Sequence, residues 1–143
     1  MKFPPRVLSD LRAGNVLGVR AGPGEHRIIG IWMVMVGDRV FARSWSLKPR
    51  SWWRTFAQER VGAIRIGDRL IAVRGVATRS ARLLDAVDRA YGAKYTTPSA
   101  LKYVKDMCRE RSRRTTTEFV PRSTRPGGRA KRALRSTSTS RSR

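Results

Sequence analysis

Cysteine, histidine and long apolar runs are scarce in this 143-residue chain, and each shortage excludes a class of protein. A single cysteine, Cys108, excludes an internal disulfide framework. A single histidine, His26, makes a conventional zinc site of several Cys and His ligands improbable. The longest apolar run, residues 28–36, is far shorter than the roughly 20 residues of a membrane helix, and the N-terminus lacks signal-peptide features. We therefore expect a cytoplasmic protein that does not span a membrane.

Acidic residues are also few, and the chain is strongly basic. It has 10 Asp and Glu against 32 Lys and Arg, which gives a net charge of +22, and 26 of the 32 bases are arginine. Such a polycation is attracted to nucleic acid or anionic lipid without any sequence preference. The arginines are scattered over almost every segment, however, so an arginine-rich surface without a dedicated partner explains most of the charge equally well.

The C-terminal end differs in composition from the rest of the chain. Residues 120–143 contain eight bases and no acid, and their bulk is Ser, Thr, Arg, Pro and Gly. Leu134 is nearly the only large apolar side chain there, so little burial would offset the entropy of ordering. We predict a single domain over residues 1–121 and a disordered basic tail over residues 122–143, which could contact nucleic acid weakly and nonspecifically.

Turn and cap residues divide the domain into short helices and strands. Gly37 and Gly67 each begin a two-residue turn before an aspartate, and glycine at that position supplies the positive φ of a type II′ hairpin. Ser80 and Thr97 are expected helix N-caps. The expected elements are a helix from Pro5, a strand around Leu17, strands 28–36 and 39–45, a helix within 49–58, strands 61–66 and 69–77, helices after Ser80 and Thr97, and a strand over 115–120.

Two antiparallel hairpins with flanking helices indicate an α+β protein built on a small antiparallel β-barrel. In the helix after Ser80 we expect Asp85 and Arg89 to pair at i,i+4. In the helix after Thr97 we expect Leu101, Val104 and Cys108 to face inward. A thiol on the apolar face of a helix is usually an inert small hydrophobe, so Cys108 is predicted to be structural.

No familiar catalytic motif is present in the sequence. It has no phosphate-binding loop and no dinucleotide glycine fingerprint, and its carboxylates are dispersed, so we assign no catalytic residue. The most informative segment is residues 43–54, which combines three tryptophans with four cations, hydroxyl groups and a helix start. Arginine forks and free N–H groups at a helix N-terminus suit a phosphate, and indole faces suit a flat heteroaromatic ring. Equally, Trp52, Trp53 and Phe56 at helical spacing fit an ordinary core.

Four stretches of this sequence resemble a group of short bacterial proteins catalogued as a domain of unknown function. They are GEHRIIGIWMVMVGDRVFARSW, KPRSWWRTF, LLDAVDRAYGAKY and TTTEFVP, and the resemblance covers about residues 3–121. The group is similar, more distantly, to the deazaflavin-dependent nitroreductases. The matching positions are Arg27 before the central strand, Ser44 at the end of its partner, and Trp52-Trp53 at the helix start.

The wider resemblance implies a split β-barrel of the kind that binds FMN or deazaflavin, frequently as a homodimer. In that hypothesis Arg27, Lys48 and Arg50 hold a phosphate, Ser44 hydrogen-bonds to it, and Trp45 and Trp52 flank the ring. Any hydride chemistry would be that of the cofactor, in a nitroreductase-like oxidoreductase. Two alternatives remain open: a non-enzymatic basic module for nucleic acid or an acidic partner, and an assembly protein whose own tryptophans fill the cavity.

Overall fold

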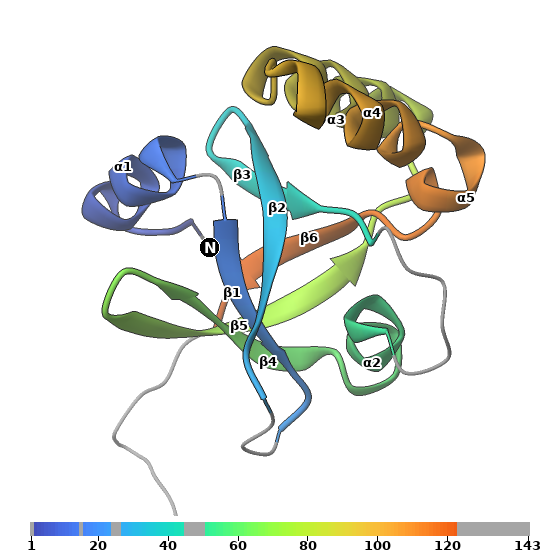
Figure 1. Ribbon diagram of the computed structural model, residues 1–143. Coiled ribbons are helices and arrows are strands. Elements are labelled where there is room, and N and C mark those ends of the chain that lie inside the picture. Colours follow the sequence, from blue (N-terminus) through green and yellow to red (C-terminus); the bar gives the residue numbers. More distant parts are fainter. Residues whose placement is uncertain (1, 15, 24–26, 45–50, 123–143) are drawn as a thin grey trace, which may run out of the picture.

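The computed structural model describes residues 2–14, 16–23, 27–44 and 51–122. Within them six strands form a closed antiparallel barrel, in the spatial order β1-β2-β3-β6-β5-β4 (Figure 1). The strands are β1 (Val16–Ala21), β2 (Ile29–Val36), β3 (Arg39–Ala42), β4 (Val61–Ile66), β5 (Arg69–Ala77) and β6 (Thr117–Pro121). The helices are α1 (Pro5–Ala13), α2 (Trp52–Glu59), α3 (Ala81–Lys94), α4 (Pro98–Met107) and α5 (Glu110–Arg113).

Both predicted hairpin turns are present and fix the register of their strands. Val36 pairs with Arg39 across the first turn and Ile66 with Arg69 across the second. Gly37 and Gly67 have φ of 61° and 59°, a region that side chains with a Cβ rarely enter. The predicted α+β antiparallel barrel with flanking helices is therefore confirmed. The predicted strand 39–45 is shorter than expected, because β3 ends at Ala42.

Two helices cover opposite ends of the barrel. Helix α1 packs against β2 and β4 and buries Val7, Leu8 and Leu11. Helix α2 lies at the other end and inserts the ring of Phe56, which is 1% exposed, against β4 and β5. Glycine at position 75 makes this insertion possible, because a Cβ there would lie 2.6 Å from Cγ of Phe56.

Helix α3 packs against β2, α4 packs against α3, and α5 follows beside α4 (Figure 1). Ser80 and Thr97 cap α3 and α4 as predicted, since their side chains accept hydrogen bonds from the N–H groups of Leu83 and Ala100. Besides the core inside the barrel, the protein has a second cluster of buried apolar residues, which lies between these helices and the sheet. Its fully buried members are Val34, Phe41, Val87 and Tyr91.

Two predictions about these helices are wrong. On α4, Val104 is buried and Cys108 packs against the same core cluster, as predicted, but Leu101 is 47% exposed because Ala100 and Met107 complete the inner face. Asp85 does not pair with Arg89; its ion pair is with Arg113 of α5, 3.1 Å away. A local i,i+4 rule cannot foresee a partner that tertiary packing brings from 28 residues along the chain.

Candidate functional site

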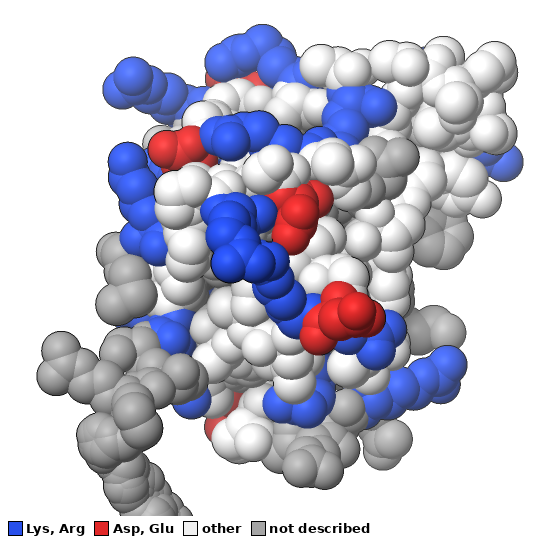
Figure 2. All heavy atoms as spheres, turned by 90° about the vertical axis from the view of Figure 1, so that its left-hand side faces the viewer, with Lys and Arg blue, Asp and Glu red and all other residues white. Residues whose placement is uncertain are grey.

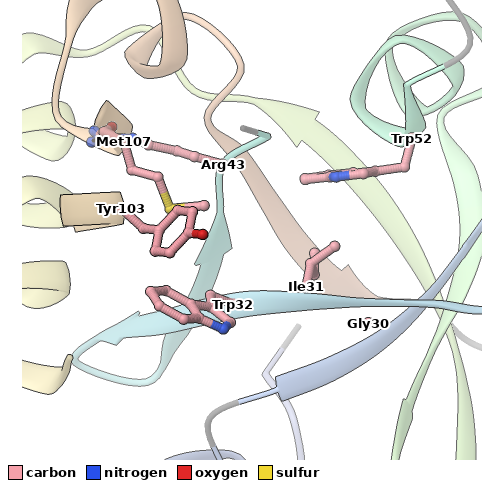
Figure 3. A pocket seen from close by; sticks show the side chains of 7 residues that line it. All are labelled: Gly30, Ile31, Trp32, Arg43, Trp52, Tyr103 and Met107. Carbon is pink, nitrogen blue, oxygen red and sulfur yellow. Dashed lines mark hydrogen bonds between the residues drawn. The ribbon is translucent and has the colours of Figure 1, made fainter. Parts of the chain in front are cut away.

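A cavity of about 300 Å³ opens on the side of the barrel, between β2, α4 and the first residue of α2 (Figure 3). We call it the aromatic slot. Its lining residues are Gly30, Ile31, Trp32, Arg43, Trp52, Tyr103 and Met107. The side chains of Trp32, Trp52 and Tyr103 therefore border this cavity without filling it.

The slot lies where β2 and β3 separate. The last pair of the β2–β3 ladder is Met33 with Ala42, so the next pair in the same register would be Trp32 with Arg43. The hydroxyl of Tyr91 stands between them instead. It accepts a hydrogen bond from the N–H of Arg43 at 3.0 Å and donates one to the carbonyl of Trp32 at 2.9 Å. This inserted hydroxyl satisfies both backbone groups while the strands diverge toward the slot.

One side of the slot is formed by aromatic rings from β2 and α4. The ring of Trp32 is stacked on that of Tyr95, with centroids 4.5 Å apart and an interplanar angle of 6°. Tyr103 meets Trp32 edge-on at 5.9 Å and is 44% exposed. The hydroxyl of Tyr95 donates to the carbonyl of Met33 at 2.6 Å, which helps to fix the orientation of the stack.

Trp52 forms the opposite side. In Figure 3 its indole points from α2 toward the slot, while Trp32, Tyr103 and Met107 lie across from it. The ring is 8% exposed and packs against Phe119 at 5.8 Å and Phe56 at 6.3 Å. Trp52 is therefore both a core residue and a lining residue of the slot. The two interpretations of the aromatic spacing at residues 52–56, a cofactor pocket and an ordinary core, do not exclude each other at this position.

Arg43 lines the slot, but its guanidinium is engaged elsewhere. The side chain is fully buried; Nε donates to Thr116 Oγ1 at 2.8 Å, and the terminal nitrogens donate to the carbonyls of Met107 and Leu84, each at 2.9 Å. It also pairs with the carboxylate of Asp88. A buried charge with this many partners is a structural crosslink between the end of β3 and the helical layer formed by α3 and α4, rather than an anion-binding group.

Burial shifts the pKa of three groups near the slot, Tyr91, Tyr95 and Cys108. Burial raises the pKa of the Tyr91 and Tyr95 hydroxyls, so both stay protonated and keep donating to the backbone of β2. Burial also raises the pKa of the Cys108 thiol, which argues against a reactive thiolate there. No group of three or more His, Cys, Asp or Glu positioned for a metal occurs among the described residues.

Three of the six predicted site residues fall within the described residues. Trp52 lines the slot. Ser44 is 3% exposed; its N–H donates to Thr115 Oγ1 at 2.8 Å and its carbonyl accepts from Ser112 Oγ at 2.8 Å. Arg27 is exposed before β2 and does not line the slot, although Gly30, three residues further on, does. The other three predicted residues, Trp45, Lys48 and Arg50, lie outside the described residues, as does His26.

Sequence reasoning missed Trp32, Tyr103 and Met107 as lining residues. Trp32 lies in a strand that is apolar on both faces, a pattern that predicts burial but not which side chain borders a cavity. Tyr103 and Met107 are four residues apart on α4. That spacing places them on one face of a helix, which was the available signal.

Comparison with solved structures supports the class of fold. Conserved hypothetical protein Rv2991 from Mycobacterium tuberculosis matches with a TM-score of 0.56 and 14% identity, over 86% of this chain and 82% of that one. A Listeria innocua protein described as "Putative Pyridoxamine 5'-phosphate oxidase" matches with a TM-score of 0.55 and 12% identity, over 82% of this chain and 92% of that one. At such identities the likeness concerns the fold alone, and it defines the chain as a split-barrel α+β protein.

A family model identifies the chain more closely. Residues 15–119 match the family described as "Uncharacterized protein conserved in bacteria (DUF2255)", and the chain belongs to this family. The matched segment runs from the residue before β1 to the middle of β6, so it includes every lining residue of the slot. No curated protein matches the sequence. None of the helices in the described part of the chain is long and apolar enough to cross a membrane.

Proposed function

We propose that the aromatic slot binds the planar ring of a flavin or deazaflavin, and that the protein is a nitroreductase-like oxidoreductase. The observation that carries the proposal is the arrangement of Trp52 across the slot from Trp32 and Tyr103. Aromatic faces and edges on two sides suit a flat heteroaromatic ring. A volume of about 300 Å³ is at the lower end of the range for small-molecule pockets, so the slot suits the ring system rather than a whole dinucleotide.

The fold is in keeping with this class of activity. The Listeria innocua protein of similar fold is described as a "Putative Pyridoxamine 5'-phosphate oxidase", a description that names a redox reaction for that protein. The activity is carried to this chain as part of the proposal and rests on the slot, because one fold can support many functions.

The phosphate of such a cofactor would need cations other than Arg43, whose guanidinium is engaged by Asp88, Thr116 and backbone carbonyls. Lys48 and Arg50 belong to the segment that joins Ser44 to Ser51. The residues that flank this segment in the sequence, Arg43 and Trp52, both line the slot. We propose them as the phosphate-binding cations, with Arg27 as a third and the hydroxyl of Ser44 as a hydrogen-bond donor. Trp45 of the same segment would contact the ring together with Trp52.

When bound, the flavin or deazaflavin would supply the hydride or electron transfer. The described lining residues bring no carboxylate or imidazole to the slot, and in this proposal their role is to position the ring. Trp32, held by its stack on Tyr95, and Trp52, held by the core, would fix the plane of the ring. Their apolar surfaces, with Ile31 and Met107, would exclude water from one part of it.

The ring and phosphate contributions can be tested separately. Riboflavin has the ring without the phosphate, and FMN has both, so titrating each by quenching of flavin fluorescence measures the two parts. We expect saturable binding of one riboflavin per chain, weakened by Y103A, which alters an exposed lining residue without emptying the core. The variants K48Q and R50Q should reduce the advantage of FMN over riboflavin and leave riboflavin binding unchanged. If neither ligand saturates, the proposal is wrong.

A second candidate function, a basic module for nucleic acid, rests on the net charge of +22. The face in Figure 2 carries many Lys and Arg side chains, with acidic groups between them. Some of the described bases are already paired, since Asp38 contacts both Lys2 and Arg12, and Asp10 contacts Arg69. Such a surface attracts polyanions diffusely, and its affinity would fall steeply with added salt.

A further inference from the structure

A second cavity, of about 400 Å³, lies on the outer wall of the barrel over β1, β4 and β5. Arg20, Ala63, Ala72 and Arg122 line it, with Pro23 and Leu70 among the apolar lining residues. We call it the arginine pocket. It shares no lining residue with the aromatic slot.

The strand register explains how the arginine pocket forms. Arg20 of β1 pairs with Ala63 of β4, and Ala63 pairs with Ala72 of β5. The N–H of Arg122, just after β6, donates to the carbonyl of Ala72 at 2.9 Å. These residues thus form one row across four neighbouring strands, with two methyl groups in the middle and an arginine at each end. Three strand spacings separate the ends by about 14 Å, so two long side chains can reach a common ligand above the alanines.

The charge in the arginine pocket is not compensated by the described part of the protein. Nε of Arg20 is buried and has no hydrogen-bond partner there. The described lining residues include no acid, whereas Arg39, Arg43 and Arg113 elsewhere each pair with a carboxylate. A buried donor without a partner costs free energy, and an anion that accepts its hydrogen bond would recover that cost.

We propose that the arginine pocket binds a small organic phosphate monoester, with Arg20 and Arg122 as its anion-binding groups. A phosphate monoester carries a charge of about −1.5 to −2 at neutral pH, which matches two guanidinium groups. The planar fork of arginine fits phosphate oxygens in pairs. The organic part of the ligand would lie against the alanine methyls and Leu70. A cavity of this volume suits a small molecule rather than an extended polymer.

Phenyl phosphate is a suitable probe, titrated calorimetrically into the full-length protein at fixed ionic strength. We expect saturable binding of one molecule per chain, with a loss of about ten-fold or more in affinity for both R20Q and R122Q, because each removes charge-assisted hydrogen bonds. The matched control is R74Q. Arg74 is exposed on the same strand as Ala72 and does not line the pocket, so its loss changes the net charge equally.

A72L separates a built site from diffuse attraction. It keeps both arginines and the net charge but fills the space above the row, so it should weaken phenyl phosphate binding as strongly as R20Q does. Phenol, which lacks the phosphate, should not bind measurably. Thermal unfolding of each variant establishes that it is folded. The proposal is overturned if R74Q weakens binding as much as R20Q, if A72L binds normally, or if the unaltered protein shows no saturable binding.

Discussion

Trp32 and Arg43 face each other where β2 and β3 separate, and the hydroxyl of Tyr91 joins the carbonyl of the first to the N–H of the second. One oxygen atom of α3 thus takes the place of a rung in the strand ladder. The separation of the strands, the burial of Arg43 and the opening of the aromatic slot all occur at this point. The helical layer therefore shapes the slot as well as covering the sheet.

Removing this hydroxyl should destabilise the protein. In Y91F the N–H of Arg43 and the carbonyl of Trp32 would both be buried without their partner, at a cost of about 1–3 kcal/mol. Urea unfolding followed by circular dichroism measures the change. An unchanged free energy of unfolding would mean that the strands can close and re-form the direct hydrogen bond without penalty.

The buried charge of Arg43 makes Asp88 more important to stability than its neighbour Asp85. D88N would leave Arg43, whose side chain is fully buried, without its carboxylate, and we expect a loss of about 3–5 kcal/mol. D85N is the matched control. The side chain of Asp85 is 59% exposed and forms an ion pair with Arg113, so its loss should cost no more than about 1 kcal/mol. Equal effects in urea unfolding would contradict the structural role of Arg43.

We expect substitution by alanine to have opposite effects on stability at Gly75 and at Gly92. In G75A the new methyl group would collide with Phe56, and overpacking of this kind costs about 1–3 kcal/mol. In G92A the methyl group would meet no atom within 4 Å on the exposed side of α3, and alanine should stabilise the helix by about 0.5–1 kcal/mol. The two melting temperatures, compared with that of the unaltered protein, should lie on opposite sides of it. A G75A variant as stable as the parent would place Phe56 elsewhere.

The basic C-terminal segment can be removed without cutting the barrel. Strand β6 ends at Pro121, and the N–H of Arg122 still bonds to Ala72, so a chain ending at Arg122 keeps every described contact. If the tail supplies the nucleic-acid affinity, this truncation should abolish binding to a duplex of arbitrary sequence, and added salt should do the same for the full chain. Fluorescence anisotropy measures both effects. Undiminished binding by the truncated chain would assign the affinity to the folded domain.

The parts of the fold that follow from local chemistry were predictable from the sequence. Glycine at the first turn position gave the hairpins at Gly37 and Gly67, and hydroxyl caps gave the starts of α3 and α4. The role of Arg43 was not predictable in this way. Its partners Asp88 and Thr116 are 45 and 73 residues away in the sequence, so an arginine at a strand end looked available to an anion.

The candidate site was predictable only in part, for a related reason. Trp52 could be identified because it belongs to a local cluster of tryptophans and cations. The opposite side of the slot is formed by β2 and α4. Trp32 and Tyr103 are far apart in the sequence, so no local pattern indicates that their rings meet. The proposed contacts of Trp45, Lys48 and Arg50 stay predictions, as do the homodimer and the weak nucleic-acid contact of the basic tail.

The central claim is that a flavin-type ring binds between Trp32 and Trp52. The most direct measurement is a nitrogen–proton correlation spectrum of the four tryptophan indole groups, assigned by Trp-to-Phe substitution and followed during a riboflavin titration. The claim predicts large, saturable shifts for Trp32 and Trp52 with little change for Trp53, which does not line the slot. A spectrum in which the signals of Trp32 and Trp52 stay in place at saturating riboflavin would contradict it.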